Sequence, residues 1–474
     1  MESYLLTDII YNILSHLNKD DSFNFINICK TVMKHKYYLY EKYVFNDNAL
    51  IATNEFMHHI KMLKSPKIID FYKLKFNNLT TLNLNLNNLY NDPISDHHFE
   101  SVFNNLPKTL LTLSIDHEYL NIQLPKLPIN LRVLNIISCT FNQSLNNLPL
   151  FLETLHITCF NFNKPLTQLP ASLQKINMCS REFNHPLDNL PIRLKSLKLE
   201  CRFFNCSINN LPLFLENLYI DCGRFNKALD ELPPTLQNLD INSYTFDHAL
   251  DNLPKTLRSL TLFRNGYNKK ANFKYLSNLT KLKISDYFSN SFYKLNNYFP
   301  INLKILRLTS NYFNDSLNNL PKTLECLILN CYLFNQSLNN LPNLKRLVIK
   351  SDMFNKSVNK LPETLIELQI SCKYFNKSLS NLPKSLEVLN IFSNKFNKKI
   401  SELPDNLHTL ILNCCSLNKG LSNPPINLKT ILINYYNSHK QYNKPLLAPF
   451  WQYSPFILVL IIIIFVIHYR IYEC

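Results

Sequence analysis

The stretch that decides the fold runs from Phe141 to Asn161 and reads FNQSLNNLPLFLETLHITCFN. The pattern starts again at Phe162-Asn163 and recurs at steps of about 21 residues along most of the chain. Repetition at this period indicates a solenoid in which each repeat contacts only its neighbours. The repeats start at Phe99, Leu120, Phe141, Phe162, Phe183, Phe204, Phe225, Phe246, Tyr267, Phe313, Phe334, Phe354, Phe375, Phe396 and Leu417.

Each repeat carries the segment Leu-x-x-Leu-x-Leu/Ile, as in Leu386 to Ile391. Its end alternates apolar and polar residues, which predicts a short strand with one buried face. The Leu-Pro pair before it favours an extended or turn backbone, because proline fixes φ and restricts its predecessor. A repeat this short has no room for a full helix. The sequence therefore predicts parallel strands on the concave side of a solenoid, and turns or polyproline-like segments on the convex side.

Two irregularities interrupt the repeats. The step from Phe334 to Phe354 is one residue short, and the stretch from Tyr267 to Tyr312 holds two degenerate repeats without clear Phe-Asn and Leu-Pro signatures. We expect a kink or an insertion in that stretch.

Composition excludes several functions. Only three glycines occur in 474 residues, and all are isolated, so no glycine-rich phosphate loop is present. The net charge of +16 could attract nucleic acid or an anionic membrane. The lysines are scattered, however, and no basic block with interleaved aromatic residues appears, so we predict no nucleic-acid binding.

Thirteen cysteines are an odd number, and no secretory signal begins the sequence, so we predict reduced thiols in the cytosol. Cysteine or serine recurs two residues after each expected strand. Zinc is the alternative explanation, but no Cys-x-x-Cys pair is present, and we predict structural packing without metal or cofactor. The recurrent cysteine and serine positions after the expected strands are Cys159, Ser180, Cys201, Cys222, Ser243, Cys331, Cys372, Ser393 and Cys414.

Sequence motifs of catalysis are absent. No His-Glu-x-x-His or Gly-x-Ser-x-Gly occurs, and the adjacent histidines of His58-His59 and His97-His98 would point apart. We therefore predict a protein that binds and is not an enzyme.

The expected binding surface is the open face of the sheet. Side chains alternate across a strand, so residues between the strand leucines face outward, and their identity changes from repeat to repeat. A plain solvated sheet would show the same alternation. We predict a client-binding cluster on the concave face at His156, Lys198, Tyr219, Asp221, Asp240 and Phe263.

The N-terminal segment has helical periodicity, with apolar residues on one face, and a second helix is expected after Asp20-Asp21-Ser22. On pattern alone this is a small helical module or a cap for the solenoid. The apolar residues of the first helix are Leu5, Ile9, Ile10, Ile13, Leu14 and Leu17.

The repeats resemble the FNIP repeat, found in amoebae and in large DNA viruses of amoebae. The segment from Phe162 to Leu166, FNKPL, is close to the family form, and the segment from Leu232 to Leu239 is similar to leucine-rich repeats with Leu-Pro before the strand. This resemblance covers most of the chain and implies a leucine-rich-repeat-like solenoid.

The N-terminal hairpin resembles an F-box, although Leu6 replaces the usual proline and no Trp follows Lys30. The resemblance implies that the apolar residues named above dock a Skp-type adaptor of a cullin–RING ubiquitin ligase. The solenoid would then recruit a client protein for ubiquitination. The rival interpretation is a membrane-tethered scaffold for protein–protein interaction with no ligase role.

The C-terminal segment from Phe456 to Ile467 is an unbroken run of apolar residues, flanked by Trp451, Tyr453 and Tyr469. The run is shorter than the roughly 20 residues of a typical span, and a buried last strand is the alternative. We predict a single-pass tail anchor that leaves the bulk of the chain in the cytosol. The predicted organisation is an F-box-like module at 1–45, a helical linker or cap at 46–73, the solenoid at 74–436, a linker at 437–455 and the anchor at 456–470.

Overall fold

The computed structural model describes residues 62–64, 78–85, 103–263, 272–286, 299–400, 402–414, 421 and 424–434. The chain divides into two compact parts, Met1–Cys331 and Tyr332–Cys474, which we call the N-terminal part and the C-terminal part. The F-box-like module at 1–45 and the candidate anchor at 456–470 lie outside the described residues. No helix within the described ranges is long and apolar enough to cross a membrane.

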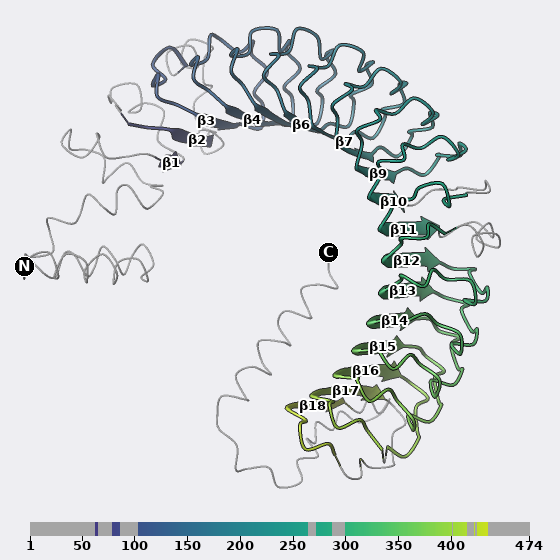
Figure 1. The fold of residues 1–474 in the computed structure, drawn as a ribbon. Coiled ribbons are helices and arrows are strands. Elements are labelled where there is room, and N and C mark those ends of the chain that lie inside the picture. Colours follow the sequence, from purple (N-terminus) through teal and green to yellow (C-terminus); the bar gives the residue numbers. More distant parts are fainter. Residues whose placement is uncertain are drawn as a thin grey trace, which may run out of the picture. The chain divides into compact units, whose positions relative to one another are not determined.

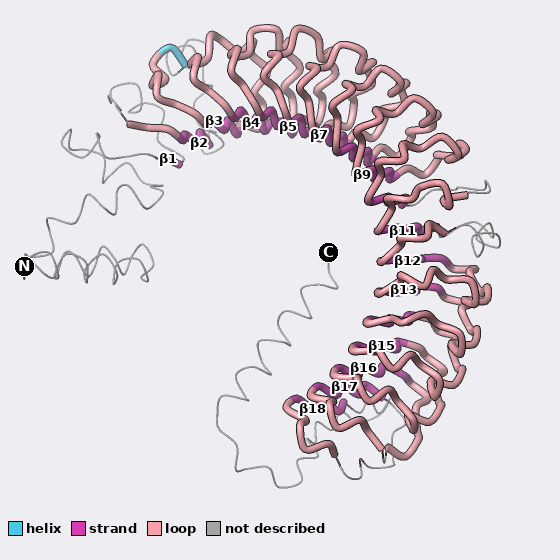
Figure 2. Tube along the Cα trace, in the orientation of Figure 1, coloured by secondary structure: helices cyan, strands magenta, loops and turns pink. Residues whose placement is uncertain are grey.

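The N-terminal part is a stack of short parallel strands, each paired in register with the next. In this part the strands lie along the inner side of the curved stack and the loops along the outer side (Figures 1 and 2). The strands are β1 (Met62–Lys64), β2 (Thr81–Asn85), β3 (Thr112–Asp116), β4 (Val133–Ser138), β5 (Thr154–Cys159), β6 (Lys175–Cys179), β7 (Ser196–Glu200), β8 (Asn217–Asp221), β9 (Asn238–Asn242), β10 (Ser259–Phe263), β11 (Lys281–Asp286), β12 (Ile305–Ser310) and β13 (Cys326–Cys331).

The C-terminal part repeats the same construction, with parallel pairs in register from β14 to β18. The predicted solenoid of parallel strands is therefore confirmed for the described residues of both parts. Its strands are β14 (Arg346–Lys350), β15 (Glu367–Ser371), β16 (Val388–Ser393), β17 (Thr409–Cys414) and β18 (Thr430–Asn434).

The strand leucines form the core, as their spacing predicts. In β8, Leu218 and Ile220 are buried while the residues that alternate with them are half-buried on the other face. Because the side-chain period of a strand is two, every strand places one row inside the solenoid and one row on the open face of the sheet.

The Leu-Pro pair sets the turn before most of the strands. The amide of Leu152 donates a hydrogen bond to the carbonyl of Pro149, at 3.0 Å, and Leu194 and Pro191 repeat this contact at the same distance. Proline is suited to this position because it needs no donor there. The two residues between proline and leucine lie at the exposed tip of the turn.

The Phe-Asn pair stabilises the stack in two ways. Phe141, Phe162 and Phe183 are fully buried and stack face to face, with ring centroids 6.1 and 6.2 Å apart. The asparagine that follows accepts a hydrogen bond on its side-chain oxygen from the next repeat in most repeats, as between the Asn163 amide and Asn142 at 2.9 Å. One residue pair therefore supplies both an aromatic column and a polar ladder.

The recurrent cysteines and serines are buried, which confirms their expected packing role. Serine and cysteine find different partners at this position. The Ser180 hydroxyl donates to the carbonyl of Phe162 at 2.8 Å, whereas the Cys159 thiol makes a long contact of 3.8 Å with the carbonyl of Ile136. No cluster of metal-binding residues occurs in the part of the chain that the structure describes.

Within the stretch from Tyr267 to Tyr312, the described residues 272–286 and 299–312 are more regular than their sequence indicates. Strands β11 and β12 lie within it, and β11 pairs in register with β10 on one side and with β12 on the other. Leu282 and Ile284 of β11 and Leu306 and Leu308 of β12 are buried like the matching residues of other repeats, even though the Phe-Asn and Leu-Pro signatures are weak. The sheet therefore runs through this stretch of the N-terminal part.

Candidate binding surface

A single row of side chains crosses the open face of the sheet from β5 to β12. Register partners on successive strands place these residues side by side, one strand spacing of about 4.8 Å apart. The row consists of His156, Asn177, Lys198, Tyr219, Asp240, Thr261, Lys283 and Arg307. Four of the six predicted client-binding residues belong to it.

The other two predicted residues lie in the adjacent row. Asp221 of β8 pairs in register with Asn242 of β9, which pairs with Phe263 of β10. The structure thus brings all six predicted positions into two neighbouring rows of one surface, which we call the inner face.

Acidic and aromatic groups meet at β7 and β8. The Lys198 ammonium is 2.7 Å from the Glu200 carboxylate and 5.0 Å from the centre of the Tyr219 ring. The Tyr219 hydroxyl donates to the Asp221 carboxylate at 3.3 Å. Partial burial, followed by the charges of Asp221, Asp240 and Glu200, raises the pKa of the Tyr219 hydroxyl, so it remains a hydrogen-bond donor at neutral pH.

Asp240 is the most perturbed carboxylate of the inner face. Burial is the largest cause and the charge of Asp221 adds to it, so the pKa of the Asp240 carboxyl rises to about 6. Lys283 and a hydrogen bond with Thr261 act in the opposite direction. The folded protein therefore disfavours the ionised form of the Asp240 carboxyl relative to the protonated form.

Cations occupy β11 and β12. Lys281 and Lys283 lie on β11, and Arg307 is the register partner of Lys283 on β12. Burial, then the charges of Lys281 and Arg307, lowers the pKa of the Lys283 ammonium. The Arg307 Nε is buried and makes no hydrogen bond within the described structure.

His156 lies at the other end of the row. Its Nδ1 is 2.9 Å from the side-chain amide of Asn177. Burial, and then the charge of Lys175, lowers the pKa of the imidazole, which favours a neutral ring at pH 7. The ring can therefore exchange hydrogen bonds with a partner without adding a charge.

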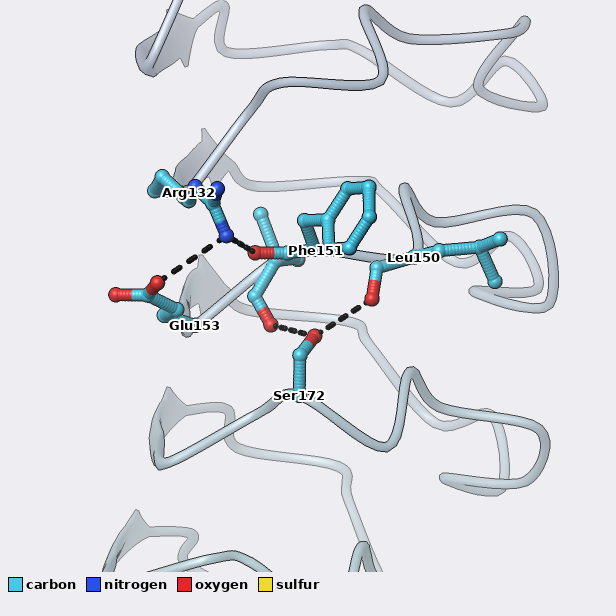
Figure 3. A network of polar contacts seen from close by, with 6 residues as sticks. Arg132, Leu150, Phe151, Glu153 and Ser172 are labelled. Atoms are coloured by element: carbon cyan, nitrogen blue, oxygen red, sulfur yellow. Dashed lines mark hydrogen bonds and ion pairs between the residues drawn. The ribbon is translucent and has the colours of Figure 1, made fainter.

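A border row of charges precedes the strands, and several of its members are already paired. Arg132 contacts Glu153 at 3.3 Å and donates to the carbonyl of Phe151, while the Ser172 hydroxyl bonds two carbonyls of the preceding repeat, including that of Leu150 at 2.8 Å (Figure 3). Lys195 and Glu216 form a similar pair at 3.8 Å. Half-exposed pairs of this kind contribute little stability.

Sequence reasoning missed the cationic half of the inner face. The repeats at Tyr267–Tyr312 lack clear Phe-Asn and Leu-Pro signatures, so the repeat pattern alone does not align Lys281, Lys283 and Arg307 with the other strands. The remaining signal was the alternation Leu282-x-Ile284 and Leu306-x-Leu308, which places Lys283 and Arg307 between buried residues.

Comparison with solved structures places the chain among leucine-rich-repeat folds. It is similar to CroV588, described as a novel circular leucine-rich-repeat protein, with a TM-score of 0.57 and 24% identity over 82% of this chain and 68% of that chain. Matches also occur to YopM from Yersinia enterocolitica WA-314, with a TM-score of 0.38 and 20% identity over 80% of this chain and 87% of that chain. The leucine-rich effector YopM from Yersinia pestis matches with a TM-score of 0.43 and 21% identity over 69% of this chain and 84% of that chain.

The similarity to CroV588 shows the fold alone. No protein-family model matches the sequence, and no curated protein matches it. The F-box and FNIP resemblances therefore remain predictions.

Proposed function

We propose that this protein is a non-enzymatic scaffold that binds a client protein on the inner face. One observation carries the proposal: over a frame of buried leucine, isoleucine and methionine side chains, the mostly half-buried row on the open face changes residue from strand to strand, and the inner face is polarised in charge. Glu200, Asp221 and Asp240 lie on β7 to β9, while Lys281, Lys283 and Arg307 lie on β11 and β12.

The energetics of these groups support a binding role. Burial disfavours the ionised forms of both the Asp240 carboxyl and the Lys283 ammonium, and Lys283 also has two cationic neighbours. Groups held in costly ionisation states are concentrated at functional sites. A client segment with a basic part over Asp240 and an acidic part over Lys283 would relieve both costs.

Affinity capture with matched variants tests the inner face. We expect Tyr219→Ala combined with Lys283→Glu to lose specific client proteins from a native-cell lysate. The control makes the same kinds of change at exposed turn tips, Leu213→Ala with Lys255→Glu, and should retain them. Identical captured proteins from both variants would refute client binding on this surface.

The finer proposal is a substrate receptor of a cullin–RING ubiquitin ligase. It is supported by the F-box-like pattern at 1–45, which lies outside the described residues, ahead of a leucine-rich-repeat fold. The full chain should capture a Skp-type adaptor, and Ile9→Asp with Ile13→Asp should abolish the capture while the solenoid stays folded. Failure of the unmodified chain to capture the adaptor would remove the ligase role and leave the scaffold.

The apolar run from Phe456 to Ile467 favours a second candidate, a scaffold tethered to a membrane without a ligase role. Extraction with alkaline carbonate tests the tether. An anchored chain stays with the membranes, whereas release of the full-length protein into the soluble fraction would contradict the anchor.

A further inference from the structure

Arginines and phenylalanines alternate across four consecutive turns at the carboxyl ends of strands β5 to β8. The guanidinium of Arg181 lies 5.3 Å from the centre of the Phe160 ring and 5.6 Å from that of Phe203. The guanidiniums of Arg224 and Arg202 lie 4.6 and 5.7 Å from the Phe203 ring. We call Phe160, Arg181, Arg202, Phe203 and Arg224 the arginine–phenylalanine stack.

Backbone hydrogen bonds between the turns hold the stack in place. The amide of Arg181 donates to the carbonyl of Phe160 at 3.1 Å, and the amide of Phe203 donates to the carbonyl of Arg181 at 3.2 Å. The turns therefore follow the spacing of the strands, about 4.8 Å per repeat. Three guanidiniums are thus gathered over roughly 10 Å of surface.

The positive charge of the stack is largely uncompensated. Arg181 pairs with Glu182 at 3.4 Å. Arg202 and Arg224 are exposed, and no carboxylate among the described residues lies within ion-pair distance of either. Neighbouring like charges repel one another, so an anion placed between these guanidiniums would stabilise the arrangement.

We propose that the arginine–phenylalanine stack binds an acidic segment of a partner protein. The planar guanidinium forms two parallel hydrogen bonds with a carboxylate, and the stacked phenyl rings fix its orientation. Carboxylates two residues apart on an extended segment point the same way about 7 Å apart, so two of them fit within the roughly 10 Å over which the three guanidiniums are gathered.

The geometry disfavours single-stranded nucleic acid as the occupant. Such strands bind by stacking bases on free aromatic faces along an extended basic groove. Here guanidiniums from Arg181 and Arg224 already contact the Phe203 ring, and the cations cover only a few repeats. The stack also lies on the carboxyl edge of the sheet and not on the inner face, so this second surface does not depend on the client-binding proposal.

Fluorescence anisotropy with the full chain tests the proposal, using a labelled peptide of ten glutamates and a labelled thymidine oligonucleotide of ten nucleotides. We expect Arg202→Gln with Arg224→Gln to weaken peptide binding about tenfold or more, because two charge-assisted contacts are lost. The control, Lys108→Gln with Lys255→Gln, removes the same net charge from exposed turns and should weaken it less than about twofold.

Three outcomes would overturn the proposal. In the first, the peptide fails to bind the unmodified chain. In the second, the two double variants bind the peptide equally well. In the third, the oligonucleotide binds the unmodified chain more tightly than the peptide does, and this difference in affinity disappears in the arginine variant. The last result would make the edge a nucleic-acid site. Both arginines are exposed, so the variants should keep the thermal melting of the unmodified chain.

Discussion

At the scale of one residue, the half-buried carboxylate of Asp240 on the inner face lowers the stability of the folded protein. Its carboxyl pKa is raised from 3.8 to about 6, chiefly by burial and then by Asp221. The folded protein therefore binds this proton more tightly than the unfolded chain does. The free energy of unfolding should fall as pH rises from about 4 to about 6, and the loss should persist above that range.

We therefore expect Asp240→Asn to melt at a higher temperature than the unmodified chain at pH 7, and the gain should shrink toward zero near pH 4. Thermal melts of both proteins between pH 4 and pH 8 measure this difference. A difference that does not change with pH would show that the Asp240 charge is not strained in the folded protein.

The buried thiols give a second prediction at this scale. Burial is the main cause that raises the pKa values of Cys159, Cys331 and Cys372 to about 12, from 9.0. Because only the thiolate is nucleophilic, these residues should resist alkylation at pH 8 in the folded protein and react after denaturation. Exposed Cys139 is the internal control and should be labelled first. Peptide mass mapping after brief alkylation measures the modification of each cysteine. Modification of the three buried thiols as fast as that of Cys139 would contradict their burial in the folded protein.

At the scale of the element, the phenylalanine column holds neighbouring repeats together. Phe183 is fully buried and stacks on Phe162 and Phe204, with centroids 6.2 and 6.0 Å away. Replacing it with alanine removes the ring from two contacts and leaves a cavity.

Phe183→Ala should lower the free energy of unfolding by about 3–5 kcal/mol, the usual cost of truncating a buried phenylalanine. The matched control is Phe214→Ala at an exposed turn tip, which should cost less than about 1 kcal/mol. Urea denaturation followed by circular dichroism measures both. Equal destabilisation by the two variants would contradict the assignment of the column as core.

The strands could be predicted from the sequence because each depends on a local pattern. The alternation of leucines fixes which side chains are buried, and it also placed Tyr219 and Asp240 on the open face. Strands β11 and β12 were less visible, since their Phe-Asn and Leu-Pro signatures are weak, and the inner face was predicted without Lys281, Lys283 and Arg307. The partners of the recurrent cysteines and serines could not be predicted, because they depend on which carbonyl of the preceding repeat the side chain reaches.

At the scale of the whole molecule, function depends on residues that the repeat brings together from distant positions. Arg181, Phe203 and Arg224 are about one repeat apart in sequence, so no local motif marks them, yet the fold stacks them. The sequence lacks a basic block with interleaved aromatic residues, and the fold assembles a small one. A repeat protein thus presents separate surfaces, the inner face and the carboxyl edge, whose specificities can differ.

The most direct test of the central claim is photocrosslinking in the native cell with p-benzoylphenylalanine in place of Tyr219. The account predicts light-dependent adducts with a discrete client protein, and these adducts should weaken when Lys283→Glu is added. The same amino acid in place of Phe214, at an exposed turn tip, is the matched control and should not give that adduct. Absence of adducts from position 219, or the same adducts from both positions, would contradict a client-binding inner face.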